Sequence, residues 1–103
     1  MLFAVFFEDN TELGKDLRQQ HLPAHLAFLE KHKTQVVAAG PLLADGGEAE
    51  GGESEGGLWL VEAADRNAVT TLVKEDPFWP TGLRKSYRIA IWKQVFADGR
   101  RLV

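Results

Sequence analysis

The feature that most constrains this chain is a set of short segments that are apolar at nearly every position, within a sequence of only 103 residues. The first covers residues 2–7 with the sequence LFAVFF, and the segment at residues 58–63 begins LWLV. A strand with one face in water alternates apolar and polar residues, whereas these strands would carry apolar side chains on both faces. Protein must therefore cover both faces of the sheet that they form.

Six regular elements are predicted, in the order β-α-β-β-α-β. Asp65 provides an N-cap for the second helix. Because proline removes a helical hydrogen bond and clashes with the preceding turn, we expect Pro23 to kink the first helix or to divide it into two abutting helices. The order is typical of a ferredoxin-like α+β sandwich, and 103 residues suffice for one domain. The strands are expected at residues 2–7, 35–39, 58–63 and 87–96, and the helices at residues 11–32 and 66–75.

The segment at residues 45–57 differs in composition from the rest of the single domain, residues 1–103. It contains six glycines and four glutamates and almost no apolar side chain. Such a segment cannot enter a core, so it is predicted to be a mobile hairpin loop. No Lys-Ser or Lys-Thr pair follows its glycines, so a phosphate-binding loop is not expected.

The two predicted helices can cover only one face of a four-stranded sheet. The other face would expose roughly several hundred Å² of apolar surface, more than monomeric proteins usually expose. Covering this face on both of two subunits gains on the order of 10 kcal/mol before the costs of association. We therefore predict a homodimer joined through the sheet face. The alternative covers, the C-terminal tail and the glycine-rich loop, are too short or too polar.

The composition excludes several classes of function. The net charge is −3 and the basic residues are scattered, so no nucleic-acid partner is expected. The nearest basic cluster, Arg84, Lys85 and Arg88, is interpreted as solvated surface. The absence of cysteine excludes disulfides and thiolate catalysis. The apolar N-terminal segment lacks a basic leader and is too short for a signal sequence or a membrane span, which indicates a cytoplasmic protein with no membrane partner.

Three histidines, His21, His25 and His32, lie in the first predicted helix. His25 falls in the apolar arc of that helix, which fits either a core histidine or a general base oriented by a carboxylate. Asp76 is the best partner, because it ends the second helix before Pro77, which favours an extended backbone. Asp76 could also be the N-cap of a short turn. His32 is interpreted as a surface residue.

The spacing of His21 and His25 would also suit two zinc ligands on one helix face. However, Pro23 distorts that spacing, no glutamate adjoins His21, and no third ligand is evident. No metal site and no cofactor are therefore predicted. His21 is instead expected to face solvent or the mouth of a pocket.

Several short motifs occur in an order that resembles the YciI-like (YCII-related) family, over nearly the whole chain. The resemblance implies a ferredoxin-like subunit that pairs into a dimeric α+β barrel. It also implies a pocket built around a His and an Asp, which match His25 and Asp76. The motifs are Arg18 followed by His25-Leu26-x-x-Leu29, then Gly40-Pro41-Leu42, Gly57 before LWLVEA, Asp76-Pro77-Phe78 with Gly82-Leu83, and Ile91-Trp92.

One characterised member of that family removes hydrogen chloride from a chlorinated hydroxyhydroquinone. The resemblance therefore suggests a cofactor-free lyase or isomerase in which His25 abstracts a proton and Asp76 orients it. Arg18, which matches a family arginine, would meet an anionic substrate group, and His21 would help to position the substrate. Aromatic side chains would line the pocket and desolvate it, namely Phe28, Phe78 and Trp79.

Two other functions stay open on the sequence. The first is a small-ligand-binding or accessory protein without catalysis, because this fold serves both purposes. The second is a haem-handling or monooxygenase-like protein with His25 as an axial ligand. Substitution of His25 and Asp76 would separate catalysis from binding.

Overall fold

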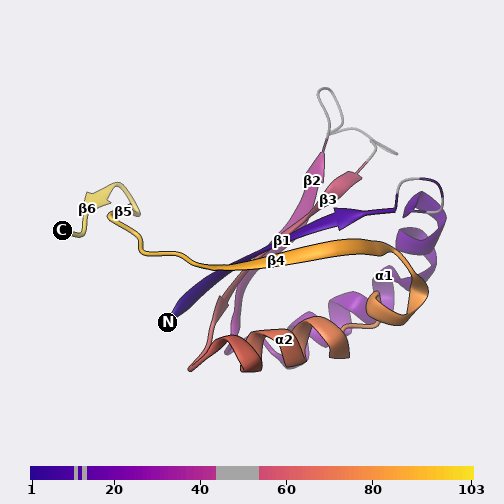
Figure 1. Cartoon of the computed structure of the whole chain (residues 1–103), viewed down its shortest axis with the longest axis horizontal. Coiled ribbons are helices and arrows are strands. Elements are labelled where there is room, and N and C mark those ends of the chain that lie inside the picture. The colour runs from indigo at the N-terminus through magenta and orange to yellow at the C-terminus, as the bar shows by residue number, and fades with distance from the viewer. Residues whose placement is uncertain (11, 13, 44–53) are drawn as a thin grey trace.

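The computed structural model describes residues 1–10, 12, 14–43 and 54–103. The four main strands form one antiparallel sheet in the order β2-β3-β1-β4, and both helices lie on one side of it (Figure 1). This is the predicted ferredoxin-like α+β arrangement, so the fold class of the subunit is confirmed. The elements are β1 (Leu2–Asp9), α1 (Gly14–Lys31), β2 (Val36–Leu43), β3 (Ser54–Glu62), α2 (Arg66–Glu75), a short 3₁₀ helix η1 (Trp79–Thr81) and β4 (Arg84–Ile91).

The helices cover the sheet face that carries the odd-numbered residues of β1. Phe3, Val5 and Phe7 are buried there and belong to one cluster with Trp59 and Val61 of the neighbouring strand β3. α2 contributes three buried side chains to the same cluster at the spacing of one helix face. They are Val69, Leu72 and Val73.

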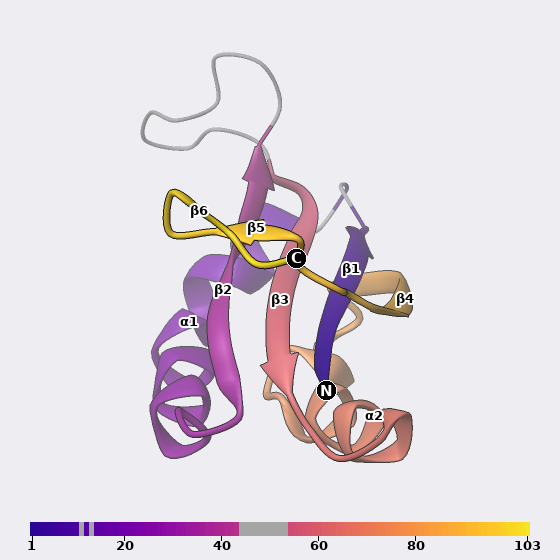
Figure 2. The same ribbon diagram turned by 90° about the vertical axis from the view of Figure 1, so that its left-hand side faces the viewer.

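The opposite face of the sheet also carries apolar side chains. Successive residues of a strand point to opposite faces, and the register pairs Ala4 with Leu60 and Phe6 with Leu58 on this second face. Leu42 of β2 extends it, opposite Gly56. Among the described residues no helix packs on this side, which Figure 2 shows in front view. The prediction of strands that are apolar on both faces is confirmed, and we call Ala4, Phe6, Leu42, Leu58 and Leu60 the open-face residues.

β3 begins at Ser54, earlier than predicted. The predicted loop at residues 45–57 is wrong for residues 54–57, which belong to β3. Gly56 and Gly57 pair with both β1 and β2, and Ser54 pairs with β2. Residues 45–53 of that loop lie outside the described residues. Gly56 shows why glycine is needed in the strand, because a Cβ at this position would lie 1.8 Å from the carbonyl oxygen of Phe7.

Helix α1 continues through Pro23, so the predicted division into two abutting helices is wrong. Pro23 and Gln19 are both exposed, and water can solvate the Gln19 carbonyl that lacks its helical partner. α2 has the predicted bounds, residues 66–75, and its N-cap Asp65 accepts a hydrogen bond from the Ala68 N–H at 2.9 Å, as predicted. Neither helix has the length and apolar character needed to cross a membrane.

β4 ends at Ile91, before the predicted end at residue 96. The C-terminal arm, residues 92–103, then leaves the sheet on the side of the open-face residues (Figures 1 and 2). It contains a small hairpin of β5 (Phe96–Ala97) and β6 (Arg100–Arg101), which sequence reasoning missed. Asp98 and Gly99 form its turn with φ angles of 54° and 73°, the conformation that an Asp-Gly pair favours in tight hairpins.

Candidate active-site pocket

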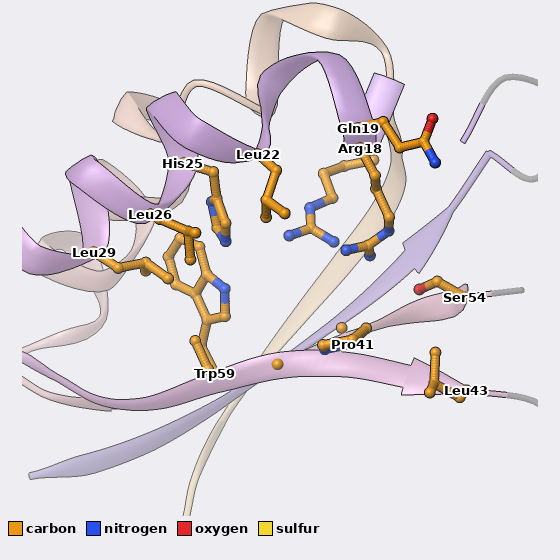
Figure 3. Close-up of a pocket in the computed structure, with 14 residues that line it drawn as sticks. Arg18, Gln19, Leu22, His25, Leu26, Leu29, Pro41, Leu43, Ser54 and Trp59 are labelled. Atoms are coloured by element: carbon orange, nitrogen blue, oxygen red, sulfur yellow. The ribbon is translucent and has the colours of Figure 1, made fainter. Parts of the chain in front are cut away.

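A pocket of about 360 Å³ lies between α1 and the β2–β3 side of the sheet (Figure 3). Its lining is mostly apolar with a few polar groups, as is usual in small-molecule sites. One stripe of α1 contributes residues at spacings of three and four, which share a helix face: Arg18, Leu22, His25, Leu26 and Leu29, with Gln19 beside them. The strands contribute Ala39, Gly40, Pro41, Leu43, Ser54, Gly57, Trp59 and Arg84.

His25 and Asp76 form a buried pair in this region. Nδ1 of His25 lies 2.7 Å from Oδ1 of Asp76, and the two residues are only 7% and 2% exposed. Asp76 caps the C-terminus of α2 with an extended backbone, as expected before Pro77. The same Oδ1 accepts a hydrogen bond from the backbone N–H of Phe78 at 3.2 Å, so Asp76 also caps the following turn. Asp76 therefore ends α2 and also accepts a hydrogen bond from the turn that follows it, as its interpretation as an N-cap predicts.

This contact determines which ring nitrogen of His25 is available to a ligand. An ionised carboxylate can only accept hydrogen bonds, so it favours the tautomer with the proton on Nδ1 and a lone pair on Nε2. Figure 3 shows the imidazole projecting from α1 into the space above Trp59. The geometry thus permits proton transfer to Nε2, with Asp76 stabilising the imidazolium that would form.

Two aromatic rings pack against the imidazole. Phe78, which is fully buried, stacks on His25 with ring centroids 4.1 Å apart and planes inclined by 17°. Trp59 stacks more distantly, at 6.3 Å, and also lines the pocket. Phe78 does not line the pocket, so it contacts the imidazole but is not expected to contact a ligand. Together the rings hold the imidazole in one orientation.

A second polar cluster, formed by Asp9, Arg18 and Arg84, lies at the same pocket. Asp9 Oδ1 accepts a hydrogen bond from Arg84 Nη1 at 2.9 Å, and Oδ2 accepts one from Arg18 Nη2. The side chains of Asp9 and Arg84 are 1% and 3% exposed, and that of Arg18 is 20% exposed. Burial lowers the pKa of Arg84, and the Asp9 carboxylate opposes this change.

The interpretation of Arg84 as solvated surface is wrong. The register of β1 and β4 places Arg84 opposite Asp9, and this pairing buries both side chains. Lys85 does point to solvent, where it pairs with Glu8 at 3.1 Å. Neither Asp9 nor Arg84 belongs to a recognisable motif. The only available signal was their position: Asp9 is an acid at the end of one apolar strand, and Arg84 is a base at the start of a strand that pairs with it.

Four of the five predicted substrate-binding residues do not line the pocket: Phe78, which stacks on His25 beside it, and also His21, Phe28 and Trp79. His21 is half-buried on α1 and does not line it. Phe28 packs in the core, near Trp59 and against the ring of His32 at 4.6 Å. Trp79 meets the edge of Tyr87 at 5.5 Å. In the described ranges, no three His, Cys, Asp or Glu side chains gather closely enough to hold a metal ion.

One solved structure has the same fold, as its TM-score of 0.80 shows. The 5-chloro-2-hydroxyhydroquinone dehydrochlorinase TftG from Burkholderia phenoliruptrix AC1100, solved with 2,5-dihydroxybenzoquinone, is 30% identical with a TM-score of 0.80, over 90% of this chain and 94% of that chain. A NIPSNAP domain protein from Burkholderia xenovorans is 10% identical with a TM-score of 0.48, over 95% and 100%. No curated protein matches. The YCII-related domain matches residues 1–93, and the chain therefore belongs to the YCII-related family.

Proposed function

We propose that this protein is a cofactor-free enzyme that abstracts a proton from a small molecule, with His25 as the general base and Asp76 as its orienting partner. The observation that carries the proposal is the 2.7 Å contact between Nδ1 of His25 and Oδ1 of Asp76 beside a pocket of ligand size. The contact leaves Nε2 of His25 as the proton acceptor.

Proton abstraction from carbon can lead to two reactions in such a pocket. In both, Nε2 takes the proton and the C–H electron pair forms a new double bond. If the adjacent carbon carries chloride, the chloride leaves with its bonding electrons and the reaction is an elimination. If no leaving group is present, the neighbouring carbon must belong to a C=O or conjugated C=C group, whose π pair moves away to give an enolate. The imidazolium then returns the proton to another carbon of this enolate, and the reaction is an isomerisation. The likeness to the dehydrochlorinase TftG supports the elimination.

Hydrogen–deuterium exchange of substrate C–H groups tests the proton transfer directly. Hydroxyhydroquinones with and without chlorine, hydroxyquinones and unsaturated lactones would be followed by NMR in D2O, together with chloride release. We expect His25→Asn to slow the reaction by about 10²–10⁴-fold, the usual contribution of a general base. Asp76→Asn should slow it less, because Nε2 remains in place.

His32→Asn is the matched control, since His32 lies just beyond α1 and does not line the pocket. A rate in His25→Asn equal to that of the unmodified protein would show that another group is the base. The second candidate function, ligand binding without catalysis, is favoured by the largely apolar lining, which can hold a ring compound unaided. Compounds that raise the melting temperature but exchange no proton would support it.

We also propose that the protein works as a homodimer joined through the open-face residues. Apolar side chains such as Phe6 and Leu60 line this face, and the C-terminal arm projects on the same side (Figure 2). Phe96 in the arm is 62% exposed. Because a single two-stranded hairpin is barely stable in water, a second subunit that covers the open face would also stabilise the arm.

Light scattering should report twice the chain mass of 11.4 kDa. Leu60→Glu places a charge at the centre of the open face and should yield monomers. Asn67→Glu, on the exposed surface of α2, is the control that adds the same charge elsewhere. A monomeric unmodified protein would contradict the dimer proposal without affecting that for His25.

A further inference from the structure

The cluster of Asp9, Arg18 and Arg84 contains more positive charge than it neutralises. Two guanidinium groups share one carboxylate, so the cluster carries a net charge of +1. Arg84 is almost fully buried, and burying an unbalanced cation is costly. The aromatic faces of Phe7 and Phe78 lie 4.1 and 5.3 Å from the Arg84 guanidinium and offset part of that cost. They supply no second negative charge. The Asp76 carboxylate also attracts the Arg84 guanidinium, but it forms no salt bridge with it and is hydrogen-bonded to His25.

The cluster also has more hydrogen-bond donors than acceptors. Two guanidinium groups offer about ten N–H donors. Within the described part of the chain, Arg18 Nη2 donates to Asp9 and to the Gly56 carbonyl, and Arg84 Nη1 donates to Asp9. The Nε atoms of both arginines are buried without any acceptor among these residues. Unpaired buried donors of this kind are rare and call for a partner.

The two arginines that carry the surplus positive charge and the surplus N–H donors face the pocket. Arg18 and Arg84 both line the pocket, whereas Asp9, their shared counter-ion, does not. Ser54 lies beside them and also lines it, but its hydroxyl donates to the Gly56 carbonyl at 2.7 Å. A ligand in the pocket therefore meets two guanidinium groups whose carboxylate is covered. Such a fork of donors matches a planar oxyanion.

We propose that Arg18 and Arg84 form an oxyanion-binding subsite and that the substrate is a small, planar ring compound with one anionic oxygen group. A phenolate, an enolate or a carboxylate would supply that group. The ring would lie against the apolar lining of Leu22, Leu26 and Pro41. The inference deepens the proposed function, because the bound anion would orient the ring toward Nε2 of His25, but the subsite itself does not depend on catalysis.

Isothermal titration with matched ring compounds tests the subsite. Benzoate supplies a carboxylate, benzamide is its uncharged counterpart, and benzylamine carries a positive charge. We expect benzoate to bind at least tenfold more tightly than benzamide, and benzylamine not to bind. A nitrophenol titrated above and below the pH at which it ionises separates a phenolate preference from a carboxylate preference. Equal affinity for benzoate and benzamide, with no preference for ionised nitrophenol, would overturn the proposal.

Substitutions identify the residues that bind the anion. Arg18→Met and the double variant Asp9→Asn with Arg84→Met should each abolish the preference for benzoate, the second without leaving an unpaired buried charge. Lys31→Met, at the exposed end of α1, removes the same charge and should leave the preference intact. Should the double variant fail to fold, Arg18→Met decides the matter, because Arg18 is partly exposed. Unchanged benzoate binding in Arg18→Met would contradict the subsite.

His25→Asn separates this inference from the proposed function. It should bind benzoate within about threefold of the unmodified protein and still lose proton exchange. If the unmodified protein binds benzoate selectively but exchanges no proton from any compound, the subsite stands and the catalytic proposal fails. If proton exchange depends on His25 while benzoate and benzamide bind alike, the catalytic proposal stands and the subsite fails.

Discussion

Asp9 and Asp76 are both buried acids at the same pocket, yet their partners differ in kind. Asp9 contacts two guanidinium groups, which stay charged at any ordinary pH. Asp76 contacts one imidazole and one backbone N–H, and an imidazole can be neutral at neutral pH. The first contact fixes charge in place, whereas the second leaves a proton free to move. Stability should therefore depend more on Asp9, and turnover more on Asp76.

Asp9→Ala should produce the largest loss of stability, because it leaves two cations, one of them buried, without their carboxylate. We expect the free energy of unfolding to fall by about 3–5 kcal/mol, the usual result of removing one partner of a buried ion pair. Urea unfolding would measure it. Asp9→Leu combined with Arg84→Met should recover much of the loss. A loss below about 1 kcal/mol would break the distinction between the two acids.

Asp76→Ala should cost less, about 1–3 kcal/mol, because the groups that lose their acceptor are an imidazole N–H and the Phe78 N–H. Asp76→Asn should cost less again, since its amide oxygen can still accept both hydrogen bonds. The same urea measurement applies. A loss in Asp76→Ala equal to that in Asp9→Ala would mean that Asp76 also neutralises a buried cation.

Asp65→Ala tests an acid that belongs to neither cluster. Asp65 caps α2 through the Ala68 N–H, and loss of such a cap costs about 1 kcal/mol. Thermal unfolding should show this loss, while benzoate affinity should stay unchanged because Asp65 does not line the pocket. Weakened ligand binding would show that α2 transmits disturbances to the pocket.

Glu8→Gln should have the smallest effect, although Glu8 is the neighbour of Asp9 in the sequence. Its ion pair with Lys85 lies in solvent, with both side chains more than half exposed, and such pairs contribute about 0–1 kcal/mol. Raising the salt concentration should remove even this difference. A large loss in Glu8→Gln would mean that position along β1, and not burial, decides the effect.

The contrast between Asp9 and Asp76 also shows which parts of the fold and the site could be predicted from the sequence. Element order, the bounds of α2, and the extended backbone at Asp76 follow from local signals such as periodicity, caps and proline. Asp9 and Arg84 are far apart in the sequence, and only the register of β1 with β4 brings them together. Patterns along a sequence do not specify that register, so the sequence suggested His25 and Asp76 but not Arg84.

The loop prediction for the glycine-containing residues 54–57 was wrong for the same reason, because tertiary contacts and not local sequence patterns decide their structure. Residues 54–57 have the composition of a loop, and nothing nearby shows that a strand must pass close to Phe7 at Gly56. The C-terminal hairpin was missed although Asp98-Gly99 is a recognisable turn signal, because its strands are too short to show alternation. Local composition predicts the kind of segment, and tertiary contacts decide its place.

The continuity of α1 through Pro23 has one more consequence. Arg18 and His25 stand seven residues apart on the same rod, so their backbone positions are separated along its axis by about 10.5 Å. The helix therefore fixes the distance that any molecule must span in order to contact both side chains. Inserting one alanine between them would rotate one side chain by about 100° relative to the other. One molecule could then no longer contact both side chains, even if every residue of the pocket were kept.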